Sequence, residues 1–367
     1  MHIVCSKENL ISNINIVLKA VPVRTTLPIL ECILLSVTDD GFFMLGNDLE
    51  MAIETKYIEA MIIEKGNIAV DAKRFSDIIR KLPDEDVIIK VEKDFTLYIK
   101  SGKTEFKISA QNPNEFPNLP TVEKNDKYTL PAKEFRNMIR QTIFSVATTE
   151  DKPALTGELI EIEDNTMNIV AVDSFRVSLR NFEMQEVKDA SNIVPAKTLS
   201  EISKLLPTDG DREVTIYFAD THALFELDDA TVVSRLIDGE FLKYKPIFTD
   251  DYTTMFTVSR SELLGSLERS MLMSTDNKKT PVKLNIDKDI LVITSTAETG
   301  KLYDELSINM EGKSLEIGFN PRYLIDAIKA IETDDIVLQF KTSLSPCIIK
   351  GADTDIYKYL ILPLRMD

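Results

Sequence analysis

The sequence predicts an α+β protein made of three copies of one domain. Three helical stretches begin at residues 72, 196 and 320, which are 124 residues apart, and each lies between two β-rich runs. Repetition at a fixed period indicates repeated structural units, and a chain of 367 residues has room for three of them. The strands, such as 96–101 and 105–109, alternate apolar and polar residues, which is typical of antiparallel sheets with one buried face.

The apolar residues of the three copied stretches, 72–82, 196–206 and 320–331, recur at helical spacing. They are Phe75, Ile79 and Leu82 in the first copy, Leu199, Ile202 and Leu206 in the second, and Leu324, Ile328 and Ile331 in the third. We therefore expect each stretch to be a helix that buries one face.

A second helix is predicted near the start of each copy. The three ranges are 6–20, 131–146 and 259–273. Ser6 has the chemistry of an N-cap, and Ser259 with Glu262 has the spacing of a capping box. Each copy thus combines two helices with about eight strands.

Other features repeat with almost the same period and mark the domain boundaries. Asp48 has a counterpart in Asp173, 125 residues later. The segment 112–120 contains three prolines and is predicted to be a linker, because neither a helix nor a central strand tolerates so many. The expected domains are 1–122, 127–246 and 251–367.

The net charge of −17 is distributed unevenly along the chain. The six predicted helices together carry +8, so the remaining residues carry −25. If the helices share one surface, that surface attracts a polyanion, and its Lys and Arg side chains would meet phosphates without reading sequence. The alternative interpretation is that helices simply expose Lys and Arg while acids gather in turns.

The residues that usually carry catalysis are scarce. His2 and His222 are the only histidines, and glycine-rich phosphate loops and paired-cysteine motifs are absent. The three cysteines, Cys5, Cys32 and Cys347, lie in apolar contexts, which favours buried thiols in a reducing compartment. No apolar run reaches the ~18 residues of a membrane span, and the N-terminus lacks a signal-peptide pattern. We expect a cytoplasmic binding protein with no catalytic residues, metal or cofactor.

Nine short motifs are spread in order along the whole chain. They are Thr26-Leu-Pro-Ile-Leu30, Gly46-Asn-Asp-Leu-Glu-Met51, Phe116-Pro-Asn-Leu119, Leu155-Thr-Gly157, Val170-Ala-Val-Asp-Ser-Phe-Arg176, Ile193-Val-Pro195, Arg235-Leu-Ile-Asp-Gly239, Glu316-Ile-Gly-Phe-Asn320 and Tyr359-Leu-Ile-Leu-Pro-Leu-Arg365. With the three repeats, these motifs resemble those of the bacterial DNA sliding clamps, the β subunits of DNA polymerase III.

The resemblance implies three clamp-type domains that form half of a closed ring. In that family, two chains join head to tail, helices line the hole, sheets lie outside, and duplex DNA passes through. The chain would tether the replicative polymerase for processive synthesis. The DNA-contacting residues, taken from the family positions and the basic helices, would be Arg24, Lys73, Arg74, Arg136, Arg140 and Lys197. Pro153 and Ala154 replace the aromatic residues of the family's DNA-contacting loop.

The resemblance also implies an apolar pocket for short peptides of polymerases, the clamp loader and repair proteins. Its residues here would be Leu155, Val172, Ser174, Phe175, Arg176, Val177, Leu242, Ile247, Asn320, Tyr323, Leu344, Pro346, Leu360, Leu362, Pro363, Leu364 and Arg365. Such a cleft is mainly apolar with a few polar anchors, for which Arg176, Asn320 and Arg365 are candidates. Since Ser174, Phe175 and Leu242 depart from the family pattern, the peptide preference is expected to differ.

For the homodimer interface, the resemblance implies two complementary patches. One contains Arg74, Lys103, Phe106 and Ile108, and the other contains Leu272, Met273, Glu298 and Asp304 of a second copy. An apolar centre flanked by opposite charges is a plausible protein interface. Two other hypotheses stay open: a peptide-binding scaffold that does not encircle DNA, and a nuclease or hydrolase with an unrecognised carboxylate site.

Overall fold

The computed structural model describes residues 1–149, 152–273, 280–298 and 300–365, so residues 366 and 367 of the expected third domain lie outside the described residues. Within the described residues there are six α-helices and 26 strands. The chain divides into two compact units. Unit 1 contains Met1–Arg136 and Glu201–Leu236, and unit 2 contains Asn137–Ser200 and Ile237–Asp367.

Unit 1 contains two antiparallel sheets. One has the strand order β5-β1-β7-β8-β9 and the other β10-β15-β16-β17-β4-β3-β2-β6. The bounds are β1 His2–Cys5, β2 Cys32–Val37, β3 Phe42–Asn47, β4 Met51–Thr55, β5 Met61–Glu64, β6 Gly66–Asp71, β7 Val87–Val91, β8 Thr96–Ser101, β9 Thr104–Ser109, β10 Tyr128–Pro131, β15 Glu213–Phe218, β16 His222–Glu226 and β17 Ala230–Arg235. Pairing of β17 with β4 joins strands of the first and second repeats in one sheet.

Helices α1 (Lys7–Val17) and α2 (Ala72–Lys81) cover the core of unit 1. The hydroxyl of Ser6 accepts a hydrogen bond from the Asn9 backbone N–H, which confirms the predicted N-cap. Leu10 and Ile14 from α1 pack into the same buried cluster as Phe75 and Ile79 from α2. The helical spacing predicted from the sequence is therefore the spacing that builds this core.

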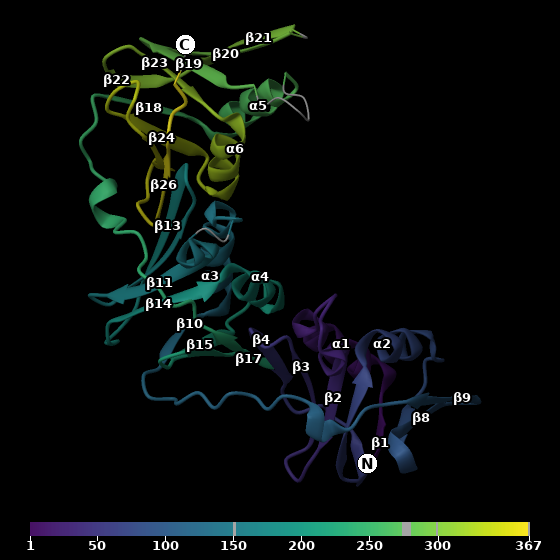
Figure 1. The fold of residues 1–367 in the computed structure, drawn as a ribbon. Helices are drawn as coiled ribbons and strands as arrows, with labels where there is room; N and C mark the ends of the chain where they lie inside the picture. Colours follow the sequence, from purple (N-terminus) through teal and green to yellow (C-terminus); the bar gives the residue numbers. More distant parts are fainter. Residues whose placement is uncertain (150–151, 274–279, 299, 366–367) are drawn as a thin grey trace. The chain divides into compact units, whose positions relative to one another are not determined.

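Unit 2 contains a sheet of order β14-β11-β12-β13-β26-β25-β24-β18-β22 and a sheet of order β21-β20-β19-β23. The bounds are β11 Gly157–Glu163, β12 Thr166–Val172, β13 Arg176–Glu183, β14 Ala190–Pro195, β18 Thr254–Ser259, β19 Val282–Asp287, β20 Ile290–Ala297, β21 Gly300–Ser307, β22 Asn309–Gly312, β23 Leu315–Phe319, β24 Asp335–Phe340, β25 Cys347–Gly351 and β26 Tyr357–Ile361. Figure 1 shows β13 beside β26, where Val177 is opposite Leu360. Helices α5 (Arg260–Met271) and α6 (Pro321–Ala330) contribute to the main buried cluster of unit 2, which also contains Phe256, Leu284 and Ile293.

Helices α3 (Ala132–Arg140) and α4 (Ala196–Leu205) contribute residues to both units. The copied helices α2, α4 and α6 each follow one strand and precede another, as the repeat predicts. All nine of their predicted apolar positions are buried. The equivalent aspartates Asp48 and Asp173 have the same structural role. Each carboxylate accepts two backbone N–H hydrogen bonds within a turn.

Two predictions about helix ends were wrong. The helix predicted over 131–146 ends at Arg140, and Ile143–Ser145 forms a separate 3-10 turn. Ser259 occupies the N-cap position of α5 without a capping hydrogen bond, and its hydroxyl lies 3.1 Å from that of Ser261 instead. Serine side chains readily form such local bonds, and these compete with the capping geometry.

Candidate partner-binding and nucleic-acid sites

An apolar cluster lies on one face of the large sheet of unit 2. Its buried members include Leu159, Val172, Val177 and Leu360, which come from β11, β12, β13 and β26. Gly157, at the start of β11, allows the close packing beside this cluster, because a Cβ there would lie 2.6 Å from the Val194 carbonyl oxygen. This apolar cluster is called the apolar floor below.

Two hollows adjoin this floor. The first, of about 910 Å³, is lined by Leu155, Val172, Ser174, the segment 238–243 and neighbouring residues. The second, of about 140 Å³, is lined by Ile247, Thr249, Tyr252, Pro346, Leu360 and neighbouring residues. Concave and mostly apolar surfaces of this kind suit a small ligand or a short peptide.

Phe175 and Tyr323 form an aromatic pair beside these hollows. Their ring centroids are 5.9 Å apart and the rings are nearly parallel. The Arg176 guanidinium lies 4.6 Å from the Tyr323 ring centroid and adds a cation–π contact. Phe175 remains 48% exposed, so its ring can pack against a ligand.

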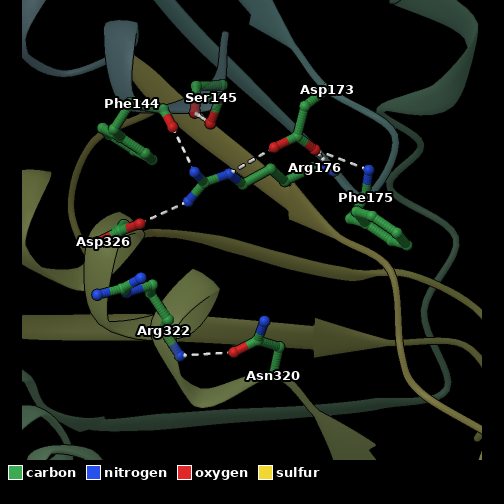
Figure 2. Close-up of polar contacts among 9 residues, drawn as sticks. Phe144, Ser145, Asp173, Phe175, Arg176, Asn320, Arg322 and Asp326 are labelled. Atoms are coloured by element: carbon green, nitrogen blue, oxygen red, sulfur yellow. Dashed lines mark hydrogen bonds and ion pairs between the residues drawn. The ribbon is translucent and has the colours of Figure 1, made fainter. Parts of the chain in front are cut away.

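Arg176 is held by contacts within unit 2 (Figure 2). Its Nε donates to Asp173 at 3.0 Å, one terminal nitrogen donates to Asp326 at 2.7 Å, and the other donates to the Phe144 carbonyl. Only 12% of its side chain is exposed. Arg176 therefore packs against the aromatic pair from a fixed position, and its expected role as a polar anchor for ligand stays a prediction.

The other two candidate anchors also have defined positions. The Asn320 side chain caps α6 by accepting a hydrogen bond from the Arg322 backbone N–H, as Figure 2 shows. Arg365 is exposed. The segment after β26, residues 362–365, is called the tail here. Two backbone hydrogen bonds hold it: the Leu362 N–H donates to the Phe175 carbonyl at 2.9 Å, and the Leu364 N–H donates to the Gly318 carbonyl at 2.8 Å.

All 17 residues of the predicted pocket lie in unit 2. Those in the buried cluster or at the edges of the hollows are Leu155, Val172, Ser174, Val177, Leu242, Ile247, Pro346 and Leu360. Those that are exposed or partly exposed beside them are Phe175, Arg176, Asn320, Tyr323, Leu344, Leu362, Pro363, Leu364 and Arg365. Phe241 and Tyr244 also lie at this site but were not predicted, although Gly239-Glu-Phe241 repeats the Asn114-Glu-Phe116 linker motif.

The predicted DNA-contacting residues are mostly on helices. Arg24 follows α1 in an irregular segment, Lys73 and Arg74 lie in the first turn of α2, Arg136 and Arg140 lie on α3, and Lys197 lies on α4. All are exposed except Arg136, which is half-buried. Exposed cations on helices can contact phosphates without reading base sequence.

Most of the predicted dimer residues lie at two strand edges and just after α5, and Arg74 lies in the first turn of α2. Lys103, Phe106 and Ile108 belong to β9 or its turn, at the edge of the five-stranded sheet. Asp304 lies on β21, at the edge of the four-stranded sheet, where Arg269 of the same chain binds it at 2.5 Å and lowers its pKa. Leu272 is 77% exposed just after α5, Met273 is half-buried, and Glu298 is exposed.

No group of three or more metal-ligating side chains occurs among the described residues. None of the helices in the described ranges is long and apolar enough to span a membrane. Glu158 on β11 is the one buried carboxyl among the described residues whose two oxygens lack a hydrogen-bond partner. Burial raises its pKa to about 8.

Comparisons with known proteins cover the whole chain. Models of the DNA polymerase III β subunit match residues 1–120 with the N-terminal domain, 129–243 with the central domain and 245–365 with the C-terminal domain. The β sliding clamp of Staphylococcus aureus is 32% identical over 375 residues, covering 100% of this chain and 99% of the relative.

Three solved structures give the same result, each with full coverage of both chains. A DNA polymerase III β subunit from Eubacterium rectale has a TM-score of 0.97 at 40% identity. The sliding clamp of Bacillus subtilis has a TM-score of 0.96 at 32% identity. A sliding clamp from Pseudomonas aeruginosa bound to griselimycin has a TM-score of 0.93 at 28% identity.

Proposed function

The chain belongs to the family of DNA polymerase III β subunits, the β sliding clamps, and from this premise we propose that two copies close into a ring around duplex DNA. The chain is a replication protein, a processivity factor rather than an enzyme. The observation that carries the proposal is the match to clamps along all three domains. The proposed boundaries, 1–122, 127–246 and 251–367, lie close to the matched segments. The site of action would be the cytoplasm, with no membrane partner.

Charge distribution supports DNA as the ligand of the helices. The chain is acidic overall at −17, yet α2 carries Lys73, Arg74, Arg80 and Lys81 against the single acid Asp77. A ring that holds DNA by topology needs only weak phosphate contacts, which also permit sliding. Arg24, Lys73, Arg74, Arg136, Arg140 and Lys197 are the proposed contacts.

Two open sheet edges support the dimer. β9 and β21 are both edge strands, and unpaired strand edges are surfaces on which another chain can add. We propose that β9 with Arg74, Lys103, Phe106 and Ile108 meets β21 of a second copy with Leu272, Met273, Glu298 and Asp304. Exposed Leu272 would then be buried in the assembled ring.

The two hollows of unit 2 support a peptide site. The apolar floor, the exposed ring of Phe175 and the hydrogen-bonded tail together form a surface that could bind a short extended peptide. Peptides of the polymerase, the clamp loader and repair proteins are the proposed ligands. Phe175 and Leu242 present large apolar surfaces, so we expect a preference for bulky apolar side chains.

A mass measurement followed by a topology assay tests the ring. Light scattering should give close to twice 41.5 kDa. After loading by the clamp loader, the protein should stay on nicked circular DNA through gel filtration and leave once a restriction enzyme linearises the circle. A monomer, or equal retention on both DNA forms, would contradict the ring and favour the scaffold hypothesis.

A truncation tests the peptide site. Removing the residues after Ile361 leaves β26 intact and deletes Leu362 and the rest of the tail. Binding of a fluorescein-labelled peptide from the polymerase of the same genome should be lost while the dimer mass persists. Unchanged peptide affinity would refute the assignment of the hollows.

A further inference from the structure

One segment borders both hollows of unit 2. Residues 238–248, called the strap here, line the first hollow through 238–243 and the second through Ile247. Leu242 and Ile247 remain 45% and 36% exposed, so burial of their own side chains does not fix them. The shape of both hollows therefore depends on how the strap is held.

The strap is fastened to β11 between the two hollows. The Tyr244 hydroxyl donates to the Glu161 carboxylate at 2.5 Å, and Lys245 Nζ lies 2.9 Å from the same carboxylate. Lys245 also pairs with Glu163, two residues further along β11. Side chains two residues apart on a strand lie on the same face, so β11 presents two acids as a row to which the strap is attached.

The ring of Tyr244 also attaches the strap through apolar packing. It is 4% exposed and belongs to the buried cluster with Val172, Val177 and Leu360. Lys245 Nζ lies 5.8 Å from its ring centroid. The hydrogen bond is partly buried, so water competes for it less than at the open surface.

We propose that Tyr244 and Glu161 are positioning residues of the partner-binding site, because their bond holds Leu242 on one side and Ile247 on the other. The inference rests on the proposed peptide-binding function. The pair need not touch the ligand. Its role is to keep both walls in the binding geometry before the peptide arrives, which reduces the ordering needed on binding.

The test compares Tyr244→Phe, Glu161→Gln and the double variant, using the fluorescein-labelled polymerase peptide. Tyr244→Phe keeps the buried ring and removes only the donor. We expect Kd to rise about 3- to 10-fold in each single variant, which corresponds to the net contribution of about one hydrogen bond. The double variant should show less than the sum of both effects, because one change removes the Tyr244–Glu161 bond and the other weakens the same bond.

A second tyrosine provides a matched control. Tyr217 on β15 is buried, Lys124 Nζ lies 5.6 Å from its ring centroid, and Lys124 binds Glu226. Tyr217→Phe therefore removes a hydroxyl from another buried tyrosine beside a Lys–Glu pair, and Tyr217 borders neither hollow. We expect this control to bind peptide with the parent Kd.

The outcomes distinguish failure of the proposed peptide site from failure of the proposed positioning role. If the parent does not bind the peptide, the proposed peptide site itself fails. If the parent binds and the Tyr244→Phe and Glu161→Gln variants keep the parent Kd, the positioning role is overturned. An equal rise in Kd for Tyr217→Phe, or strictly additive single effects, would also overturn it, because a general loss of stability would then explain the data.

Discussion

Replacement of Glu158 by glutamine should change how the stability of the protein depends on pH. Glu158 is fully buried on β11 and neither carboxyl oxygen has a partner among the described residues. The nearby Thr142 hydroxyl donates to the Met138 and Ile139 carbonyls instead. Burial raises the pKa of Glu158 from 4.5 to about 8. The folded protein therefore keeps a proton on this carboxyl throughout the neutral range.

The sign and magnitude follow from proton linkage. Between pH 4.5 and pH 8 the unfolded chain has released the proton of Glu158 and the folded chain has kept it. The free energy of unfolding then falls as the pH rises, by up to ~1.4 kcal/mol per pH unit. Over this interval the loss is on the order of 3–5 kcal/mol, and it is complete above the folded-state pKa.

Urea unfolding at pH 5, 6, 7 and 8 measures this effect. Because the chain contains no tryptophan, circular dichroism and tyrosine fluorescence are suitable signals. Glu158→Gln should match the parent near pH 5 and exceed it progressively toward pH 8. Glu183→Gln, which changes an exposed glutamate at the end of β13, is the control and should follow the parent at every pH. A difference between Glu158→Gln and the parent that stays constant across this pH range would refute the reasoning.

Three further predictions concern the interface, the aromatic pair and the thiols. Leu272→Asp should convert the dimer into a monomer in light scattering, because it places a charge at the centre of the proposed apolar contact. Arg176→Lys should lower the free energy of unfolding by about 1–3 kcal/mol in urea, since lysine cannot reproduce the forked contacts of arginine. Cys5, Cys32 and Cys347 are free and buried, and burial raises the pKa of the first two to about 11, so a disulfide reagent should label them only after unfolding.

Matched variants make these outcomes interpretable. Ile290→Asp alters another exposed apolar residue of unit 2 and should leave the dimer mass unchanged. Arg322→Lys alters an exposed arginine on α6 and should leave stability unchanged within about 0.5 kcal/mol. A dimeric Leu272→Asp variant, an Arg176→Lys variant as stable as the parent, or rapid labelling of the native thiols would contradict the respective argument.

Most residues of the candidate site were predicted from the family resemblance, and few could be predicted from hydrophobic spacing alone. Apolar spacing identified Leu324 and Ile328 as buried residues of the third copied helix, next to Tyr323, and the structure confirms that both are buried in α6. Nothing in the local sequence shows that Arg176 is bound by Asp326, which lies 150 residues away. Its contacts were therefore decided only by the structure, whereas the pocket and DNA assignments, including the interpretation of Arg176 as a polar anchor, stay predictions.

The sequence by itself determined the α+β class, the three repeats, the positions of the helices and the separation of charge between helices and the rest of the chain. These properties are local, because backbone geometry imposes periods of 3.6 and 2.0 on neighbouring residues. Only the tertiary structure decided which distant groups meet, such as Tyr244 with Glu161, 83 residues apart, and β17 with β4 across two repeats. Such contacts depend on how whole sheets pack, and no short-range pattern records that packing.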